Sequence, residues 1–237
     1  MLLIHSELLD SDLALYLVLL GATLFALVMG IGFHEACHAY TANALGDRLP
    51  RSQGRVTLNP LAHLDPLGTI LMLVVGFGWG KPVQFNPFGL NVSPKTAAAL
   101  VAFAGPLSNF VIAGLMALPI QLGMAPYINP LSVTEFLQFR VQDTEDYVGL
   151  FLTGAVYLNC ILGVFNLIPL PPLDGYKVAL FLLPDDIARE FAKLDRYGFA
   201  PLFVLLFAVP FLTGYSPFAD IMGPAVRWLV ELFTGVG

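Results

Sequence analysis

The most informative part of the sequence is LALYLVLLGATLFALVMGIGFHEACH, residues 13–38. Its first 21 residues carry no charged side chain, and an α-helix needs roughly 20 apolar residues to cross a bilayer. The helical pattern continues to a stop signal at Gly46. The sequence therefore predicts a long transmembrane helix whose far end carries the pattern His-Glu-x-x-His.

The composition of the whole chain also indicates a membrane protein. Of the 237 residues, 57% are hydrophobic and 12% are charged, whereas soluble domains carry about 45–50% apolar and about 25% charged residues. The formal net charge of −6 argues against a nucleic-acid partner, because phosphate binding needs clustered Lys and Arg. Cys37 and Cys160 lie far apart in apolar stretches, so they do not suggest a disulfide framework. We predict an all-α polytopic membrane protein with residues 1–237 in one membrane domain.

Two further spans are predicted at residues 97–122 and 147–170. The apolar runs 199–212 and 218–233 contain prolines or charges, and we predict a C-terminal helical hairpin over about 199–235. The segment PLGTILMLVVGFGWG, residues 66–80, is short for a span and contains four glycines. It is therefore predicted to be re-entrant, within a three-helix catalytic core over about residues 12–183.

The distribution of charge predicts which loops face the cytoplasm. Residues 46–95 carry five basic side chains against two acids, and residues 171–198 carry four more basic side chains. The loop 123–146 carries one basic side chain against four acids. Because cytoplasmic loops are enriched in Lys and Arg, we predict that 46–95 and 171–198 are cytoplasmic. A full crossing by residues 66–80 would contradict this pattern, which again favours a re-entrant segment.

The His34-Glu35-Ala36-Cys37-His38 sequence is the strongest chemical signal. Residues four apart share one helix face, so both imidazoles can bind one metal while Glu35 activates the attacking water. The alternative is a polar cluster at a helix end, but ionisable residues next to an apolar span are costly and usually functional. Zinc is the expected ion, one per chain, because imidazole and carboxylate suit it and a catalytic site keeps one position open.

A third protein ligand is needed, and Asp174 is the candidate. It lies in Asn166-Leu-Ile-Pro-Leu-Pro-Pro-Leu-Asp174-Gly175, where an apolar helix breaks into a proline-rich turn at membrane depth. The alternative is that Asp174 is the N-cap of a short helix over residues 175–183.

Polar groups near these motifs are candidates for binding substrate. Asn109 and Asn166 lie in predicted spans and could orient a substrate backbone, although interhelical hydrogen bonding is the alternative. A substrate helix must unwind before it is cut, and its freed backbone groups then need partners. A short edge strand could supply them by strand addition; the predicted residues are Lys81, Pro82, Val83, Gln84 and Phe85. The alternative is a simple loop between two spans.

Together, HEACH on an apolar helix, Gly105-Pro-Leu-Ser-Asn109 and the 166–175 sequence resemble the site-2 protease family of intramembrane metalloproteases. The sequences RVTLNP (55–60), DPLGT (65–69) and GWGKPV (78–83) are similar to its small bacterial members, and no PDZ or CBS domain is inserted between the motifs. The resemblance implies a bacterial plasma-membrane hydrolase that cleaves transmembrane protein substrates. It also implies zinc held by His34, His38 and Asp174.

Two other functions compete with proteolysis. A non-proteolytic metal-binding protein or transporter would also place His and Asp inside a membrane, but it has no need of a general base such as Glu35. An inactive relative that only binds membrane segments is the third possibility, although every core residue of the motifs is present.

Overall fold

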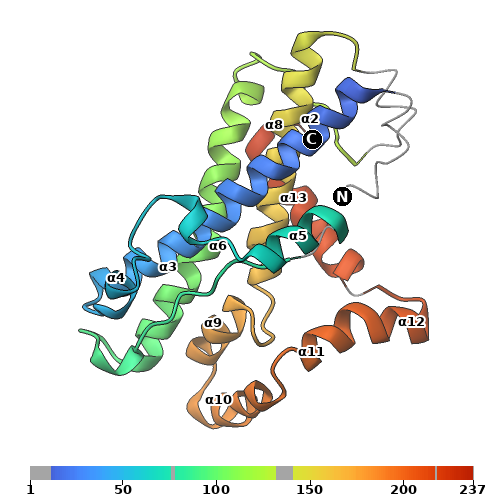
Figure 1. Cartoon of the computed structure of the whole chain (residues 1–237). Coiled ribbons are helices and arrows are strands. Elements are labelled where there is room, and N and C mark those ends of the chain that lie inside the picture. Colours follow the sequence, from blue (N-terminus) through green and yellow to red (C-terminus); the bar gives the residue numbers. More distant parts are fainter. Residues whose placement is uncertain (1–11, 76–77, 132–140, 217, 237) are drawn as a thin grey trace.

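The computed structural model describes residues 12–75, 78–131, 141–216 and 218–236. These residues are mostly helical, and no sheet forms among them. Three helices are long and apolar enough to cross a membrane, and a fourth span results if one bent helix pair is counted as a single crossing. The three, shown in Figure 1, are Leu13–Ala44, Pro94–Gln121 and Thr144–Asn166. The prediction of an all-α polytopic membrane protein is confirmed.

The first span is one long helix with an irregular middle turn. It comprises α2 (Leu13–Phe25), a π-helical turn (Ala26–Ile31) and α3 (Gly32–Ala44). The Asp12 side chain begins it by accepting a hydrogen bond from the Leu15 amide at 3.0 Å. Gly46, with φ of 113°, follows its end, so the stop signal in the sequence is where the helix ends.

The other two spans are α6 (Pro94–Gln121) and α8 (Thr144–Asn166). Ser93 caps α6 by accepting a hydrogen bond from the Thr96 amide, and Asp143 caps α8 in the same way through Asp146. Helix α6 packs against both α3 and α8, so it is the central element of the bundle.

The exposed faces of these helices are apolar. On α6, Leu107, Val111 and Leu115 lie four residues apart and are all exposed, so they form one stripe along the helix. A contiguous apolar face of this kind would be costly in water. Lipid is the solvent that fits it.

Helix α5 (Pro66–Val75) has 10 residues, about 15 Å of helix, which is half of the roughly 30 Å hydrocarbon thickness. Helix α4 (Leu49–Ser52), which precedes it, and the start of α6, which follows it, lie at the same end of the bundle (Figure 1). The chain thus returns to the end that it left, as a re-entrant segment requires. Single turns of 3₁₀ helix lie before and after this re-entrant segment, at Pro60–Ala62 and Pro87–Gly89.

The predicted edge strand over Lys81–Phe85 is not a strand. The one β-pairing among the described residues is an isolated antiparallel bridge between Leu64 and Gly80. The reason lies in the backbone groups that a strand would use for pairing. Pro82 has no N–H, the Lys81 carbonyl accepts from Arg55, and the Val83 amide donates to the Glu35 side chain. Residues 81–85 are therefore an extended segment held by side chains.

After α8 the chain forms short helices at one end of the bundle. In order, these are α9 (Asp174–Leu182), α10 (Asp185–Phe191), a 3₁₀ turn (Ala192–Tyr197), α11 (Ala200–Phe203), a π turn (Val204–Ala208) and α12 (Val209–Thr213). The Ala200–Thr213 helix is bent by 81° from Asp185–Tyr197 and lies across the end of the bundle (Figure 1).

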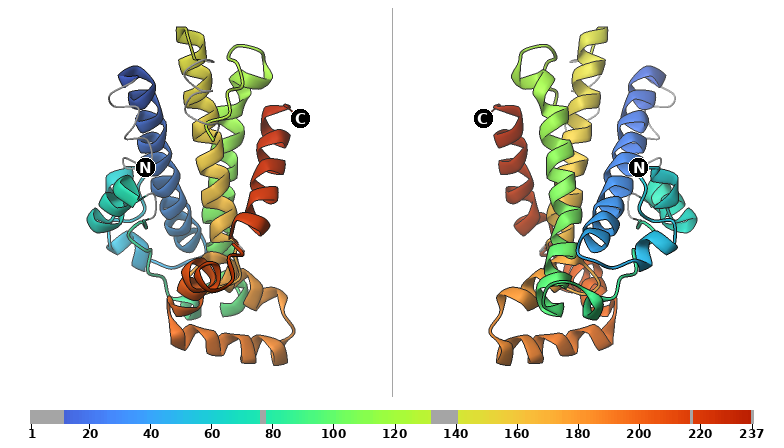
Figure 2. Two further views of the ribbon diagram at one scale, coloured as in Figure 1. Left: turned by 90° about the vertical axis from the view of Figure 1, so that its right-hand side faces the viewer. Right: turned by 90° about the vertical axis from the view of Figure 1, so that its left-hand side faces the viewer.

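The last helix, α13 (Gly223–Thr234), follows a π turn (Phe218–Met222) and stands beside α6 and α8 (Figure 2). It buries Val226 and Val230 against Ala113 and Ala117 of α6 and Val156 of α8. The predicted C-terminal helices therefore both form. They do not lie antiparallel as the predicted hairpin, because α13 buries its apolar face in the main bundle instead.

The loops gather at two opposite ends of the bundle. Helices α4, α9 and α10 lie at one end, whereas the segment after α6 lies at the other (Figures 1 and 2). This is the grouping that the charge distribution predicts for residues 46–95 and 171–198. Residues 132–140 of the predicted outer loop lie outside the described residues.

Candidate active site

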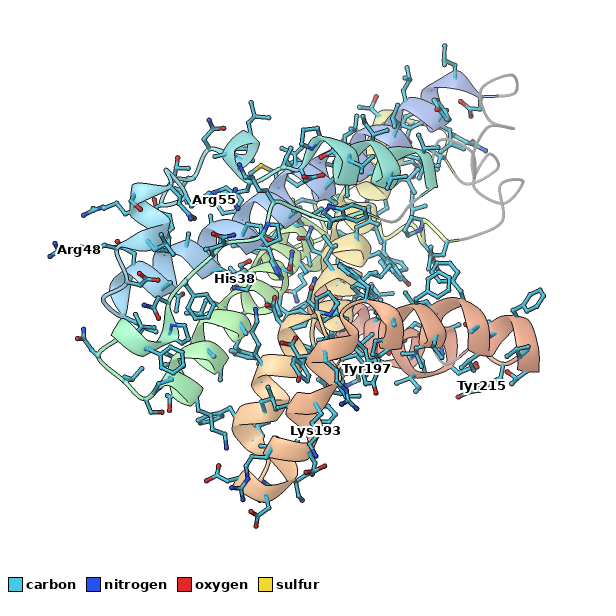
Figure 3. The ribbon with its side chains drawn as sticks, turned by 60° about the horizontal axis from the view of Figure 1, so that its bottom comes forward. His38, Arg48, Arg55, Lys193, Tyr197 and Tyr215 are labelled. Atoms are coloured by element: carbon cyan, nitrogen blue, oxygen red, sulfur yellow. The ribbon has the colours of Figure 1, made fainter. Side chains whose placement is uncertain are left out.

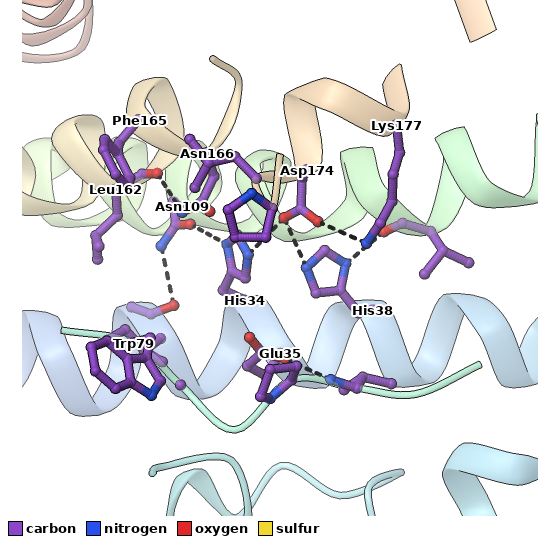
Figure 4. Close-up of a pocket in the computed structure, with 18 of the residues that line it drawn as sticks. His34, Glu35, His38, Trp79, Asn109, Leu162, Phe165, Asn166, Asp174 and Lys177 are labelled. Carbon is purple, nitrogen blue, oxygen red and sulfur yellow. Dashed lines mark hydrogen bonds and ion pairs between the residues drawn. The ribbon is translucent and has the colours of Figure 1, made fainter. Parts of the chain in front are cut away.

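Three buried ligand groups from two distant parts of the chain meet at one point. His34 and His38 lie one turn apart on α3, and Asp174 begins α9. Both imidazole Nε2 atoms lie 3.0 Å from Asp174 Oδ2, and the three ligand atoms lie within 4.8 Å of one another. Figure 4 shows the two rings and the carboxylate pointing toward one another. No other group of His, Cys, Asp and Glu in the described ranges comes this close.

The space in front of the two imidazoles fits a zinc ion. A Cβ atom on Gly105 would lie 2.5 Å from His38 Nε2 and 2.6 Å from His34 Nε2. Zinc lies about 2.0–2.1 Å from imidazole nitrogen, so a side chain at position 105 would fill the space that the ion needs. Two nitrogens and one carboxylate oxygen are a ligand set typical of catalytic zinc. The residues present therefore fit the metal.

Asp174 does not cap its helix. The N-cap of α9 is Leu173, which makes no side-chain capping bond, and the Asp174 carboxylate faces the histidines instead. Gly175 allows this approach, because a Cβ there would lie 2.1 Å from the Leu167 carbonyl oxygen. A carboxylate binds a metal in its ionised form.

Asn109 is hydrogen-bonded to one of the two histidines. Its Oδ1 lies 2.8 Å from His34 Nδ1, and its Nδ2 donates to the Gly30 carbonyl at 3.1 Å and to Asn159 Oδ1 at 3.2 Å. The side chain is fully buried, and both amide hydrogens are used. Oδ1 must therefore face His34, so Nδ1 is the donor and Nε2 keeps its lone pair for a metal. Asn109 thus makes the interhelical hydrogen bonds that the sequence offered as the alternative, and it orients His34; contact with a substrate stays a prediction.

His38 is oriented in the same way by the backbone. Its Nδ1 lies 2.6 Å from the Val101 carbonyl oxygen, which accepts a hydrogen bond from it and again leaves Nε2 free. The sequence does not reveal this contact, since a backbone carbonyl inside a helix gives no signal of its own.

Glu35 lies beside the ligand cluster but is not part of it. Its Oε2 accepts a hydrogen bond from the Val83 amide at 3.2 Å and lies 3.9 Å from Arg55 Nη2. Figure 4 shows it across the cavity from Asp174. Glu35 lines the same cavity as the three ligand groups. Sequence reasoning gave no role to Arg55, which appeared there only among the loop cations and as the first residue of the RVTLNP sequence.

A cavity of about 320 Å³ opens onto the cluster. Most of the predicted substrate-binding residues line it, namely Pro82, Val83, Phe85, Asn109 and Asn166, whereas Lys81 and Gln84 do not. Asn166 donates its Nδ2 to the Leu162 carbonyl at 2.9 Å. Lys177, which the sequence did not single out, also lines the cavity, with its Nζ 3.8 Å from Asp174 Oδ1.

Comparison with known families agrees with this geometry. The model of "Peptidase family M50" matches residues 22–209, a range that covers most of the chain and holds every residue of the cluster. The chain belongs to peptidase family M50. This M50 peptidase is 37% identical to "Putative zinc metalloprotease YwhC" of Bacillus subtilis (strain 168) over 205 residues, which are 85% of this chain and 86% of that protein.

Two more distant relatives carry the same kind of name. "Putative zinc metalloprotease Rip2" of Mycolicibacterium smegmatis is 29% identical, over 76% of this chain and 64% of that protein. "Putative zinc metalloprotease MJ0611" of Methanocaldococcus jannaschii is 27% identical, over 66% of this chain and 68% of that protein. No solved structure matches the chain. The M50 peptidase is thus a membrane metalloprotease of the site-2 protease family, as the motifs implied.

Proposed function

We propose that this M50 peptidase hydrolyses peptide bonds within or near transmembrane segments of membrane proteins, with one zinc ion held by His34, His38 and Asp174. The place of the cluster on an apolar helix carries this proposal. His34 and His38 lie in the helix Leu13–Ala44, which is long and apolar enough to cross a membrane. Groups on such a helix can meet a substrate inside the bilayer rather than in a loop outside it.

The chain's own residues supply the proton transfers. Zinc, when bound, supplies a Lewis acid that polarises the scissile carbonyl and lowers the pKa of water. Glu35 accepts the proton of the attacking water and passes it to the leaving amine, as a general base and then a general acid. Asn109 and the Val101 carbonyl hold the two histidines in one tautomer throughout.

The extended segment supports a role in holding an unwound substrate. Each unpaired backbone group of an opened helix costs several kcal/mol in lipid. Among the described residues, none bonds to the Val83 carbonyl or to the backbone N–H and C=O of Gln84. The Val83 amide is already used by Glu35. We therefore place substrate pairing at the free groups of Val83 and Gln84.

Replacing Gln84 by proline should slow cleavage about fivefold with zinc content unchanged, because one free backbone donor worth about 1 kcal/mol is lost. Proline at 84 also keeps Val83 extended, so the contact between Val83 and Glu35 survives. Gln84→Ala is the matched control, since it keeps the backbone N–H and removes only an exposed side-chain contact to Gln53. The measurement is the cleavage rate of a membrane-spanning peptide in proteoliposomes. Equal rates for both variants would show that substrate is held elsewhere.

We further propose that residues 46–95 and 171–198 face the cytoplasm of a plasma membrane, because they carry most of the basic residues. Single cysteines at Arg51 and Asn91, both exposed, should resist impermeant thiol reagents in intact cells once Cys37 and Cys160 are replaced. Both cysteines should react after permeabilisation. Labelling of intact cells at position 91 alone would mean that residues 66–80 cross the membrane.

Mass spectrometry of membranes tests the function itself. Cells that carry the intact chain should contain cleaved membrane proteins. Cells that carry the Glu35→Gln variant should accumulate the same membrane proteins uncleaved. The new termini should lie inside or beside predicted transmembrane segments. Identical membrane proteomes would favour a metal-binding protein without protease activity, and cuts confined to soluble loops would remove the intramembrane part of the proposal.

A further inference from the structure

Arg55 is a buried arginine in a loop where its neighbours are exposed. Its relative exposure is 4%, whereas Arg48 and Arg51, on the same loop, are exposed. Figure 3 shows Arg48 at the rim of the molecule and Arg55 further in. Burying a guanidinium is costly unless it is well paired. The contacts of Arg55 should therefore explain why it lies inside.

The guanidinium joins three parts of the chain. Nη1 donates to the Ala62 carbonyl at 2.7 Å, Nη2 donates to the Lys81 carbonyl, and the same Nη2 lies 3.9 Å from Glu35 Oε2. Two residues after Lys81, the Val83 amide donates to that Glu35 oxygen. Arg55 thus holds the extended segment at Lys81 and places a positive charge beside the oxygen to which the segment is bonded at Val83.

We propose that Arg55 is a positioning residue that locks residues 81–83 against Glu35, so that the general base and the substrate-holding segment keep one relative geometry. This rests on the proposed function of Glu35. Without the guanidinium, the Lys81 carbonyl has no partner, and the segment beyond the Lys81 amide, which donates to the His63 carbonyl, can move away. Glu35 then loses both the Val83 amide and the nearby charge.

The contact set requires arginine rather than any cation. Lysine can supply a charge near Glu35, but its single ammonium does not reproduce a planar fork that serves two carbonyls at once. His63, which is buried in the same loop region as Arg55, does not supply the charge. His63 is fully buried, and burial lowers its pKa, so it is neutral at neutral pH. The positive charge of this cluster therefore comes from Arg55.

The test compares Arg55→Gln and Arg55→Lys with Arg48→Gln as the matched exposed control. We expect kcat to fall about 100-fold in Arg55→Gln, because a misplaced catalytic group costs about that much. Arg55→Lys should recover part of kcat, and Arg48→Gln should match the intact chain. Zinc content should be equal in all four proteins.

Hydrogen–deuterium exchange gives a second readout that does not depend on protease activity. The peptide covering residues 81–86 should exchange faster in Arg55→Gln than in Arg48→Gln, whereas peptides from α6 should not differ. Unchanged exchange at 81–86 would overturn the proposal even if no substrate were cut. A loss of kcat that followed zinc loss, or that Arg55→Lys did not reduce, would also overturn it. Failure of the intact chain to cut any membrane substrate would instead count against the proposed function.

Discussion

Replacing Gly105 by alanine is expected to abolish zinc binding and cleavage while leaving the bundle folded. The added Cβ would lie 2.5 Å from His38 Nε2 and 2.6 Å from His34 Nε2, in the space that an ion about 2.0–2.1 Å from each nitrogen requires. Alanine is otherwise favoured over glycine inside a helix by about 1 kcal/mol, and position 105 lies in the middle of α6. Helix stability and metal binding should therefore change in opposite directions.

Gly114 supplies the matched control on the same helix. A Cβ there would meet only the Phe233 ring, at 3.8 Å, an ordinary contact. Gly114→Ala should keep zinc and activity, and Asp174→Ala should lose zinc as Gly105→Ala does. Metal analysis of the purified proteins, together with their melting temperatures, separates these outcomes. If Gly105→Ala kept a full complement of zinc, the ion would lie somewhere other than in front of the two Nε2 atoms.

The sequence predicted the spans and the ligand cluster because both depend on local patterns. Hydrophobic length marks a membrane helix wherever the helix packs, so predictions at 97–122 and 147–170 lie within a few residues of α6 and α8. Two histidines four apart share a helix face before any tertiary contact forms. Asp174 depended least on a local pattern, because it lies 140 residues after His34 in the sequence and only the fold brings the two side chains together.

Partners of buried polar groups could not be predicted in the same way. The sequence shows that a polar residue in a span is costly to bury. It does not show which neighbouring group forms the hydrogen bond that offsets this cost. For Asn109 the sequence therefore left substrate contact and interhelical hydrogen bonding open, and the structure pairs it with His34. The same holds for residues 81–85. Their composition fits an edge strand, but the pairing groups are used by Arg55 and Glu35, two side chains distant in sequence.

Replacing Glu35 by glutamine is expected to lower the cleavage rate by roughly 10²–10⁴-fold, the usual contribution of general acid–base catalysis, with zinc still bound. Glutamine has nearly the same shape, and its Oε1 can still accept the Val83 amide hydrogen bond that Glu35 Oε2 accepts at 3.2 Å. Its amide cannot take a proton from water. Zinc should remain because the ligand cluster consists of His34, His38 and Asp174 without Glu35.

Two further variants, Glu35→Asp and His34→Ala, serve as comparisons for Glu35→Gln. Glu35→Asp keeps the charge beside Arg55 but withdraws the carboxylate by about 1.5 Å, one carbon–carbon bond, so it should be slow but faster than Glu35→Gln. His34→Ala should lose zinc and activity together, since a metal ligand is removed. Cleavage of a membrane-spanning peptide and zinc content are measured on the same purified samples. If Glu35→Gln lost zinc in step with activity, as His34→Ala does, Glu35 would be holding the metal, and the proton transfers would have to be assigned to another group lining the cavity.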